Sequence, residues 1–168
     1  MADVQISAPP GVPQIATTVE FDAPRYLVFR AFMEPDLLAQ WLGPRRVTMT
    51  IEEYDPRDGG RYRYTHHDPD GNEYSFHGVF HGEPSLEGAV QTFEYEGAPG
   101  HVSMDTLTLE EQGGRTIVRT NSVFQAVEDR DAMVQSGMEK GVTEGMQRLA
   151  ELLEKLKQTS AGGASRAT

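Results

Sequence analysis

The 168-residue chain has no cysteine, no run of basic residues and no long apolar stretch. Without cysteine, disulfide bonds, thiol catalysis and Cys-ligated zinc are excluded, and the composition is typical of a reducing compartment. No apolar stretch approaches the ~20 residues that cross a bilayer, and the N-terminus lacks the basic and then apolar order of a signal peptide. These absences predict a cytoplasmic protein without membrane insertion.

Positive charge is also scarce, because 15 Lys and Arg stand against 26 Asp and Glu and give a formal net charge of −11. Binding to nucleic acid depends on clustered Lys and Arg side chains that neutralise phosphates. The chain offers no such cluster. Nucleic acid and anionic membrane surfaces are therefore not expected as partners.

Both ends of the chain differ in composition from the long middle part. Residues 1–13 contain three prolines and little periodicity, which predicts a flexible N-terminal lead-in. Residues 159–168 are mostly small, and such a composition predicts a disordered tail. Residues 14–158 show no internal repeat and have the length of a single domain.

Alternating apolar residues predict strands over most of residues 14–124. The first strand is Gln14–Phe21. Two short helices are expected after it, because Pro35 separates them and Gly43-Pro44 ends the second one. About six antiparallel strands then follow, joined by turns rich in glycine, proline and aspartate.

The clearest hairpin consists of the predicted strands Arg61–His67 and Glu73–His81. If Tyr64 pairs with Phe76, all aromatic side chains of the two strands share one face of the sheet. A register that sorts the side chains this completely is favoured, since a slip by one residue would move every side chain to the other face.

A long helix is predicted near the C-terminus, over Asp129–Gln158, because apolar residues recur there at steps of three and four. Its second half is rich in leucine, whereas its first half carries Gly137, Gly141 and Gly145 along one edge of the apolar face. Each glycine costs a helix interior about 1 kcal/mol relative to alanine. Two interpretations explain that cost: close packing of the helix backbone against the sheet, or space left for an enclosed molecule.

The order of elements predicts an α+β fold. A sheet with so many consecutive hairpins must bury one face, and only the C-terminal helix is long enough to cover it. We expect a curved antiparallel sheet of about six to seven strands wrapped around this helix. A cavity would lie between them wherever large side chains do not fill the space.

Five short motifs occur in order within residues 15–156: Trp41-Leu42-Gly43-Pro44, Asp55-Pro56-Arg57-Asp58-Gly59-Gly60, Gly78-Val79-Phe80 with Glu83-Pro84, Thr92-Phe93-Glu94-Tyr95, and the glycine-spaced final helix. In this order they resemble the START/Bet v1-like (SRPBCC) superfamily, and more narrowly the bacterial proteins homologous to the C-terminal domain of the activator of Hsp90 ATPase. The resemblance implies the helix-grip fold and the binding of a small hydrophobic ligand. Relatives commonly carry tryptophan at the position of Phe93, which alters the expected pocket wall.

The resemblance implies a role as carrier, sensor or stress-related protein, but it supplies no shared catalytic motif. Because the superfamily also includes cyclases and hydrolases, an enzyme that uses the same cavity is the alternative. A second alternative is an interaction module for Hsp90. The eukaryotic co-chaperone has an additional N-terminal domain for which this chain has no room, so an Hsp90 role is disfavoured. Monomer and homodimer both stay open.

Candidate ligand-binding residues are the inward-facing aromatic and methionine side chains, together with residues of the glycine half of the final helix. Aromatic and methionine side chains fill cores and also line adaptable pockets, and several tyrosine hydroxyls on one face each need a hydrogen-bond partner. The predicted set is Trp41, Tyr62, Tyr64, Phe76, Phe80, Phe93, Tyr95, Met104, Met138, Gly141, Val142 and Gly145.

Other chemistry finds less support in the sequence. The pairs His66-His67 and His77/His81 are placed too far apart, or on opposite faces of a strand, to chelate one ion. The acidic run from Asp68 to Glu73 lacks the glycine and glutamate spacing of a calcium loop. No metal and no cofactor is therefore predicted. A general acid or base in the cavity is conceivable, with these candidates: His66, Glu94, His101 and Asp105.

Overall fold

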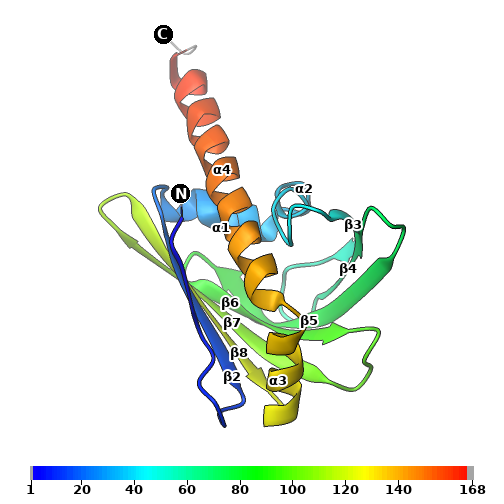
Figure 1. The fold of residues 1–168 in the computed structure, drawn as a ribbon. Helices are drawn as coiled ribbons and strands as arrows, with labels where there is room; N and C mark the ends of the chain where they lie inside the picture. The colour runs from blue at the N-terminus through cyan, green and yellow to red at the C-terminus, as the bar shows by residue number, and fades with distance from the viewer. Residues whose placement is uncertain (1, 166–168) are drawn as a thin grey trace.

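The computed structural model describes residues 2–165, with side chains described to residue 160. One antiparallel sheet contains all eight strands, in the spatial order β1-β2-β8-β7-β6-β5-β4-β3. Two short helices follow β2, and two helices end the chain (Figure 1). The bounds are β1 Val4–Ser7, β2 Gln14–Phe21, α1 Arg25–Met33, α2 Pro35–Leu38, β3 Thr48–Tyr54, β4 Arg61–His67, β5 Glu73–Ser85, β6 Gly88–Tyr95, β7 Val102–Gln112, β8 Arg115–Phe124, α3 Val127–Gln135 and α4 Met138–Ser165.

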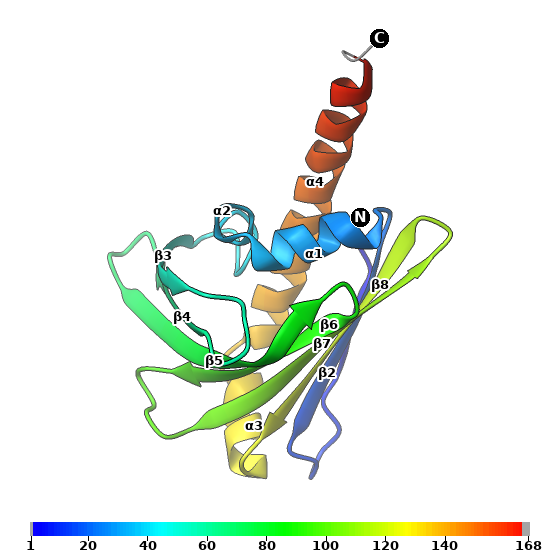
Figure 2. The same ribbon diagram turned by 180° about the vertical axis from the view of Figure 1, so that it is seen from behind.

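The sheet curves around the C-terminal helices, and α4 runs across its concave side from the α3 end to the α1 end (Figures 1 and 2). The α+β helix-grip architecture expected from the sequence is thus present. The sheet has eight strands, however, and the expected six to seven were too few. No helix in residues 2–165 is long and apolar enough to cross a membrane.

The predicted hairpin register is confirmed, because Tyr64 pairs with Phe76 and His66 pairs with Tyr74. The connecting loop owes its conformation to Asp68. Its Oδ1 accepts hydrogen bonds from the backbone N–H groups of Asp70 and Asn72, both at 2.9 Å. The side-chain amide of Asn72 donates to Oδ2 at 3.0 Å, and this bond together with the backbone bonds holds the pKa of the Asp68 carboxyl below its ordinary value. Turn formation therefore explains this acidic run.

The hydrophobic core lies between α1, the leucine-rich half of α4 and the adjoining half of the sheet. Leu27 and Val28 of α1 are fully buried, as are Leu149 and Leu153 of α4. Burial of this apolar area holds the two helices against the sheet. The N-terminus of α1 is capped from the sheet, since the backbone N–H of Arg25 donates to Glu111 Oε1 at 2.8 Å.

Helix α4 is tied to the loop after α2 by charged side chains. Arg148 donates from Nη1 to the carbonyl oxygens of Gly43 and Pro44, at 3.1 and 3.2 Å. In the same loop, the backbone N–H of Arg45 donates to Glu144 Oε2 at 2.9 Å. These contacts hold the loop over the N-terminal half of α4.

The C-terminal helical region differs from the single helix that was predicted. It is two helices, because α3 ends at Gln135 and Gly137 has a φ of +86°. Glycine adopts this left-handed conformation without steric cost and commonly terminates helices. Gly137 therefore lies outside a helix interior, and its presence is explained by the break.

The two ends of the chain also differ from the prediction. Residues 4–7 of the predicted flexible lead-in form β1, which pairs with β2 and supplies the eighth strand. Helix α4 continues through residues 159–165 of the predicted tail. Residue 1 and residues 166–168 lie outside the described part of the chain, so the prediction for them stays a prediction.

Candidate functional site

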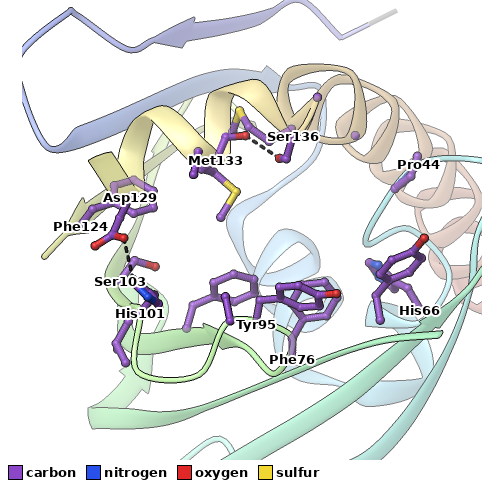
Figure 3. A pocket seen from close by; sticks show the side chains of 18 of the residues that line it. Pro44, His66, Phe76, Tyr95, His101, Ser103, Phe124, Asp129, Met133 and Ser136 are labelled. Carbon is purple, nitrogen blue, oxygen red and sulfur yellow. Dashed lines mark hydrogen bonds and ion pairs between the residues drawn. The ribbon is translucent and has the colours of Figure 1, made fainter. Parts of the chain in front are cut away.

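A cavity of about 670 Å³ lies between the sheet and the junction of α3 with α4. Figure 3 shows it with the sheet below and the helices above. Its floor comes from β5 and β6, its roof from α3 and the start of α4, and its two ends from the loop after α2 with β4 and from the start of β7 with α3. The position is the glycine-bearing end of the helical region, away from the leucine-rich core.

Aromatic rings cover the floor. Tyr74 and Phe76 of β5, and Phe93 and Tyr95 of β6, point inward because alternate residues of a strand face the same side. The rings of Phe76 and Phe93 have centroids 5.3 Å apart and planes only 22° from parallel, and Tyr95 lies 5.3 Å from Phe76. The floor is therefore a nearly continuous aromatic platform.

The roof consists of small and flexible side chains. Met133 extends from α3 toward the aromatic floor (Figure 3). Behind it, Ser136 donates its hydroxyl hydrogen to the carbonyl oxygen of Met133 at 2.6 Å, at the end of α3. Gly137 and Gly141 add no side chain, and a Cβ atom at Gly141 would meet only Pro44 Cδ, at 3.6 Å. The roof thus leaves the cavity open above the platform.

One end of the cavity is formed by His66 of β4 and by three residues of the loop between α2 and β3, Pro44, Arg46 and Val47. His66 Nε2 lies 3.1 Å from the carbonyl oxygen of Leu42 and must donate to it, because a carbonyl only accepts. Burial lowers the pKa of His66, so the ring is neutral and its Nδ1 is an acceptor. Arg46 stands exposed at the same end and forms no ion pair with any described residue.

The opposite end holds a buried hydroxyl and two acidic residues. Ser103 of β7 is only 4% exposed, and it donates to Asp105 Oδ1 at 3.0 Å. His101 Nδ1 lies 2.7 Å from Asp129 Oδ1, which joins the start of β7 to the first turn of α3 (Figure 3). Asp105 also accepts a hydrogen bond from Ser122, and burial nevertheless raises the pKa of its carboxyl.

The raised pKa of Asp105 gives a prediction for stability. Compared with the unfolded chain, folding favours the neutral form of the Asp105 carboxyl. The stability that this group contributes is therefore fully present below its ordinary pKa of 3.8, and it is lost as the pH rises through the raised pKa of the folded state. We expect Asp105→Asn to be more stable than the parent at about pH 8 and to show a flatter stability profile between about pH 4 and 8. Urea denaturation at a series of pH values measures both, and an Asn variant that is less stable at pH 8 would contradict the assignment.

Five of the twelve predicted ligand-binding residues line the cavity: Phe76, Phe93, Tyr95, Met138 and Gly141. Four aromatic ones lie in the core instead, namely Trp41, Tyr62, Tyr64 and Phe80, all less than 9% exposed. The hydroxyl of Tyr62 donates to the carbonyl oxygen of Thr92, and Trp41 Nε1 donates to that of Ala31 at 2.9 Å. Internal acceptors thus satisfy the polar atoms of Tyr62 and Trp41.

The other three predicted residues also lie away from the cavity. Met104 is 48% exposed on the outer face of the sheet, since Ser103 and Asp105 on either side point inward. Val142 packs against the main core. A Cβ atom at Gly145 would lie 3.3 Å from the carbonyl oxygen of Trp41 and 3.4 Å from the backbone nitrogen of Gly43, so this glycine permits close packing of backbone.

Of the acid–base candidates, His66 and His101 line the cavity and Asp105 lies behind Ser103. Glu94 is on the outer face, where it pairs with His77 at 3.6 Å. Among the described residues, no group of three or more His, Cys, Asp or Glu side chains could hold a metal ion.

The predicted ligand-binding set missed most of the roof and the residues at both ends of the cavity, although His66 and His101 had been named as acid–base candidates. Residues 129–135 were predicted to be the start of the long helix, and none of them was included in the ligand-binding set. Inward alternation along β7 could have identified Ser103 from Leu107 and Leu109. The lining residues absent from the predicted ligand-binding set are Pro44, Arg46, Val47, His66, Tyr74, Ala98, His101, Val102, Ser103, Phe124, Asp129, Ala132, Met133, Ser136 and Gly137.

Solved structures with the same fold come from several bacteria. A protein from Arthrobacter aurescens, solved by NMR, is 24% identical, with a TM-score of 0.83 over 90% of this chain and 91% of the other. A crystal structure from Rhodobacter sphaeroides is also 24% identical, with a TM-score of 0.83 over 91% and 99% of the two chains. A protein from Mycobacterium smegmatis is 21% identical, with a TM-score of 0.81 over 93% and 99%.

At these identities the similarity establishes the fold alone. A comparison with functionally curated proteins finds no match. The family model for activator of Hsp90 ATPase homolog 1-like proteins matches residues 22–154, which include strands β3 to β8 and most of α4. The chain therefore belongs to the family of activator of Hsp90 ATPase homolog 1-like proteins.

Proposed function

We propose that the protein binds a small, flat, hydrophobic molecule with aromatic rings in the cavity between the sheet and the α3–α4 junction. The observation that carries this proposal is the aromatic platform of the floor, in which Phe76 and Phe93 lie nearly parallel and Tyr95 adjoins them. A planar ring system stacks on such a surface over a large area. Offset stacking contributes about 0.5–1.5 kcal/mol per ring pair beyond the burial of apolar area.

The size and flexibility of the cavity support the same conclusion. Its volume of about 670 Å³ falls within the ~300–1,000 Å³ that is usual for small-molecule sites. Met133 and Met138 in the roof have unbranched, polarizable side chains that can adjust to ligands of different outline. The fold of the family is typical of ligand-binding domains, so the proposal needs no new architecture.

Binding of the neutral fluorescent probe N-phenyl-1-naphthylamine tests the proposal. We expect saturable fluorescence enhancement with one probe per chain. Phe76→Ala should weaken binding about 2- to 12-fold, because it removes a stacking partner worth about 0.5–1.5 kcal/mol. Tyr26→Ala is the matched control, since Tyr26 is a 50%-exposed aromatic residue of α1 outside the cavity.

Circular dichroism of each variant separates loss of binding from loss of fold. Enhancement that rises linearly without saturation, or that falls equally in Phe76→Ala and Tyr26→Ala, would show that the cavity does not bind this class of molecule.

A further inference from the structure

The end of the cavity at β7 and α3 presents hydrogen-bond acceptors to its interior. Ser103 Oγ directs its hydrogen to Asp105 at 3.0 Å, so lone pairs face the cavity that the residue lines. Asp129 accepts at Oδ1 from His101 Nδ1, and its Oδ2 receives no hydrogen bond from the described residues.

Ser103 and Asp129 are partly shielded from solvent. Ser103 is 4% exposed, and the side chain of Asp129 is 22% exposed. An acceptor that loses water without gaining a donor weakens binding by roughly 5- to 150-fold. A ligand that fills this end with a carbon atom or another acceptor leaves that loss in place, whereas a ligand with an O–H or N–H group removes it.

The charges that line the cavity also favour a hydrogen-bond donor at this end. Asp129 makes the β7 end acidic, and the chain as a whole has a formal charge of −11. The opposite end carries Arg46, which forms no ion pair within the described residues. An anionic group is therefore repelled from the Ser103 end, and the cavity-lining cation Arg46 lies across the aromatic floor.

Resting on the proposed function, we infer that the ligand carries a hydrogen-bond donor, a phenol-type hydroxyl or an amine, that binds between Ser103 and Asp129. The aromatic body then lies on Phe76 and Phe93, and the donor is at the end of the molecule remote from Arg46. This assigns Ser103 and Asp129 as residues that determine ligand specificity.

Isothermal titration with matched naphthalenes tests the assignment. 2-Naphthol and 2-methoxynaphthalene share the ring system, but only the first can donate. We expect 2-naphthol to bind about tenfold more tightly, 2-(aminomethyl)naphthalene to share this preference, and 2-naphthoate to bind more weakly than either. Ser103→Ala and Asp129→Asn should each reduce the preference for 2-naphthol severalfold while leaving the affinity for 2-methoxynaphthalene unchanged.

Two variants serve as controls of the same chemistry outside the cavity. Ser122→Ala removes a hydroxyl that bonds Asp105 without lining the cavity, and Glu128→Gln neutralises an exposed acid in the first turn of α3. Both should retain the full preference for 2-naphthol.

The outcomes separate this inference from the proposal beneath it. Equal, saturable binding of 2-naphthol and 2-methoxynaphthalene overturns the donor assignment and leaves aromatic binding intact. Loss of preference in Ser122→Ala equal to that in Ser103→Ala overturns direct contact with Ser103. Absence of binding by all four compounds overturns both the donor assignment and the proposed function.

Discussion

Replacing Gly141 with leucine is expected to leave the protein folded and to weaken binding of N-phenyl-1-naphthylamine by tenfold or more. A Cβ atom at this position meets only Pro44 Cδ, at ordinary van der Waals distance, and Gly141 lines the cavity. The remaining leucine atoms therefore occupy space that a ligand would fill. The substitution also relieves up to about 1 kcal/mol of helix-propensity penalty, so the melting temperature should stay constant or rise.

Gly145→Leu is the matched control, one helical turn further along α4. Here the added Cβ atom would lie 3.3 Å from the carbonyl oxygen of Trp41, and the atoms beyond it would collide with backbone. Overpacking of this kind costs about 1–3 kcal/mol. Thermal denaturation should show Gly145→Leu melting well below Gly141→Leu. Similar melting temperatures, or unimpaired probe binding by Gly141→Leu, would contradict the position assigned to the cavity.

Trp41→Ala is expected to destabilise the protein by about 3–5 kcal/mol, the usual cost of removing a buried large aromatic side chain. Trp41 is 1% exposed, its ring packs edge-on against Phe32 with centroids 4.8 Å apart, and its Nε1 donates to the carbonyl oxygen of Ala31. Because native domains are stable by only about 5–15 kcal/mol, this loss is a large fraction of the total. Urea denaturation followed by circular dichroism measures it.

The same tryptophan supplies a spectroscopic check. Trp41 does not line the cavity, so the wavelength of its emission should stay that of a buried indole when 2-naphthol or 2-methoxynaphthalene occupies the site. Energy transfer between the rings can change the intensity, because it depends on distance, orientation and spectral overlap. Trp41→Phe keeps most of the packing and loses the hydrogen bond, and it should cost about 1 kcal/mol beyond the lost area. A stability loss below about 1 kcal/mol in Trp41→Ala would show that the ring is not a packing centre.

Local patterns predicted the sheet well because strand alternation and turn residues act over short distances. The pairing of Tyr64 with Phe76 follows from sorting side chains between two faces, and the structure has that register. The same alternation showed which residues point inward. It could not show which inward residues meet a helix and which meet a cavity, since that depends on the path of α4 over the sheet.

The path of α4 explains why only some of the predicted ligand-binding residues line the cavity. Tyr62 and Phe80 face the same side of the sheet as Phe76. They nevertheless lie in a buried cluster with the inward residues of β3. Phe76, also in β5, lies at the end of the sheet that α3 covers only partly. The difference arises from Gly137, whose left-handed φ of +86° redirects the chain between α3 and α4. An apolar spacing of three and four that continues through residues 134, 138 and 142 concealed this break.

The two edge strands of the sheet limit how copies of the chain can associate. The edge strands β1 and β3 leave backbone groups unpaired on one side, and such edges can recruit further strands. β1 is only four residues long and is soon followed by Pro9-Pro10, while β3 has a register shift between Ile51 and Glu53 and carries two glutamates there. Shortness, proline, irregularity and charge all oppose strand addition. Aggregation through a continuous intermolecular sheet is therefore disfavoured at both edges, and a homodimer would have to form through another surface.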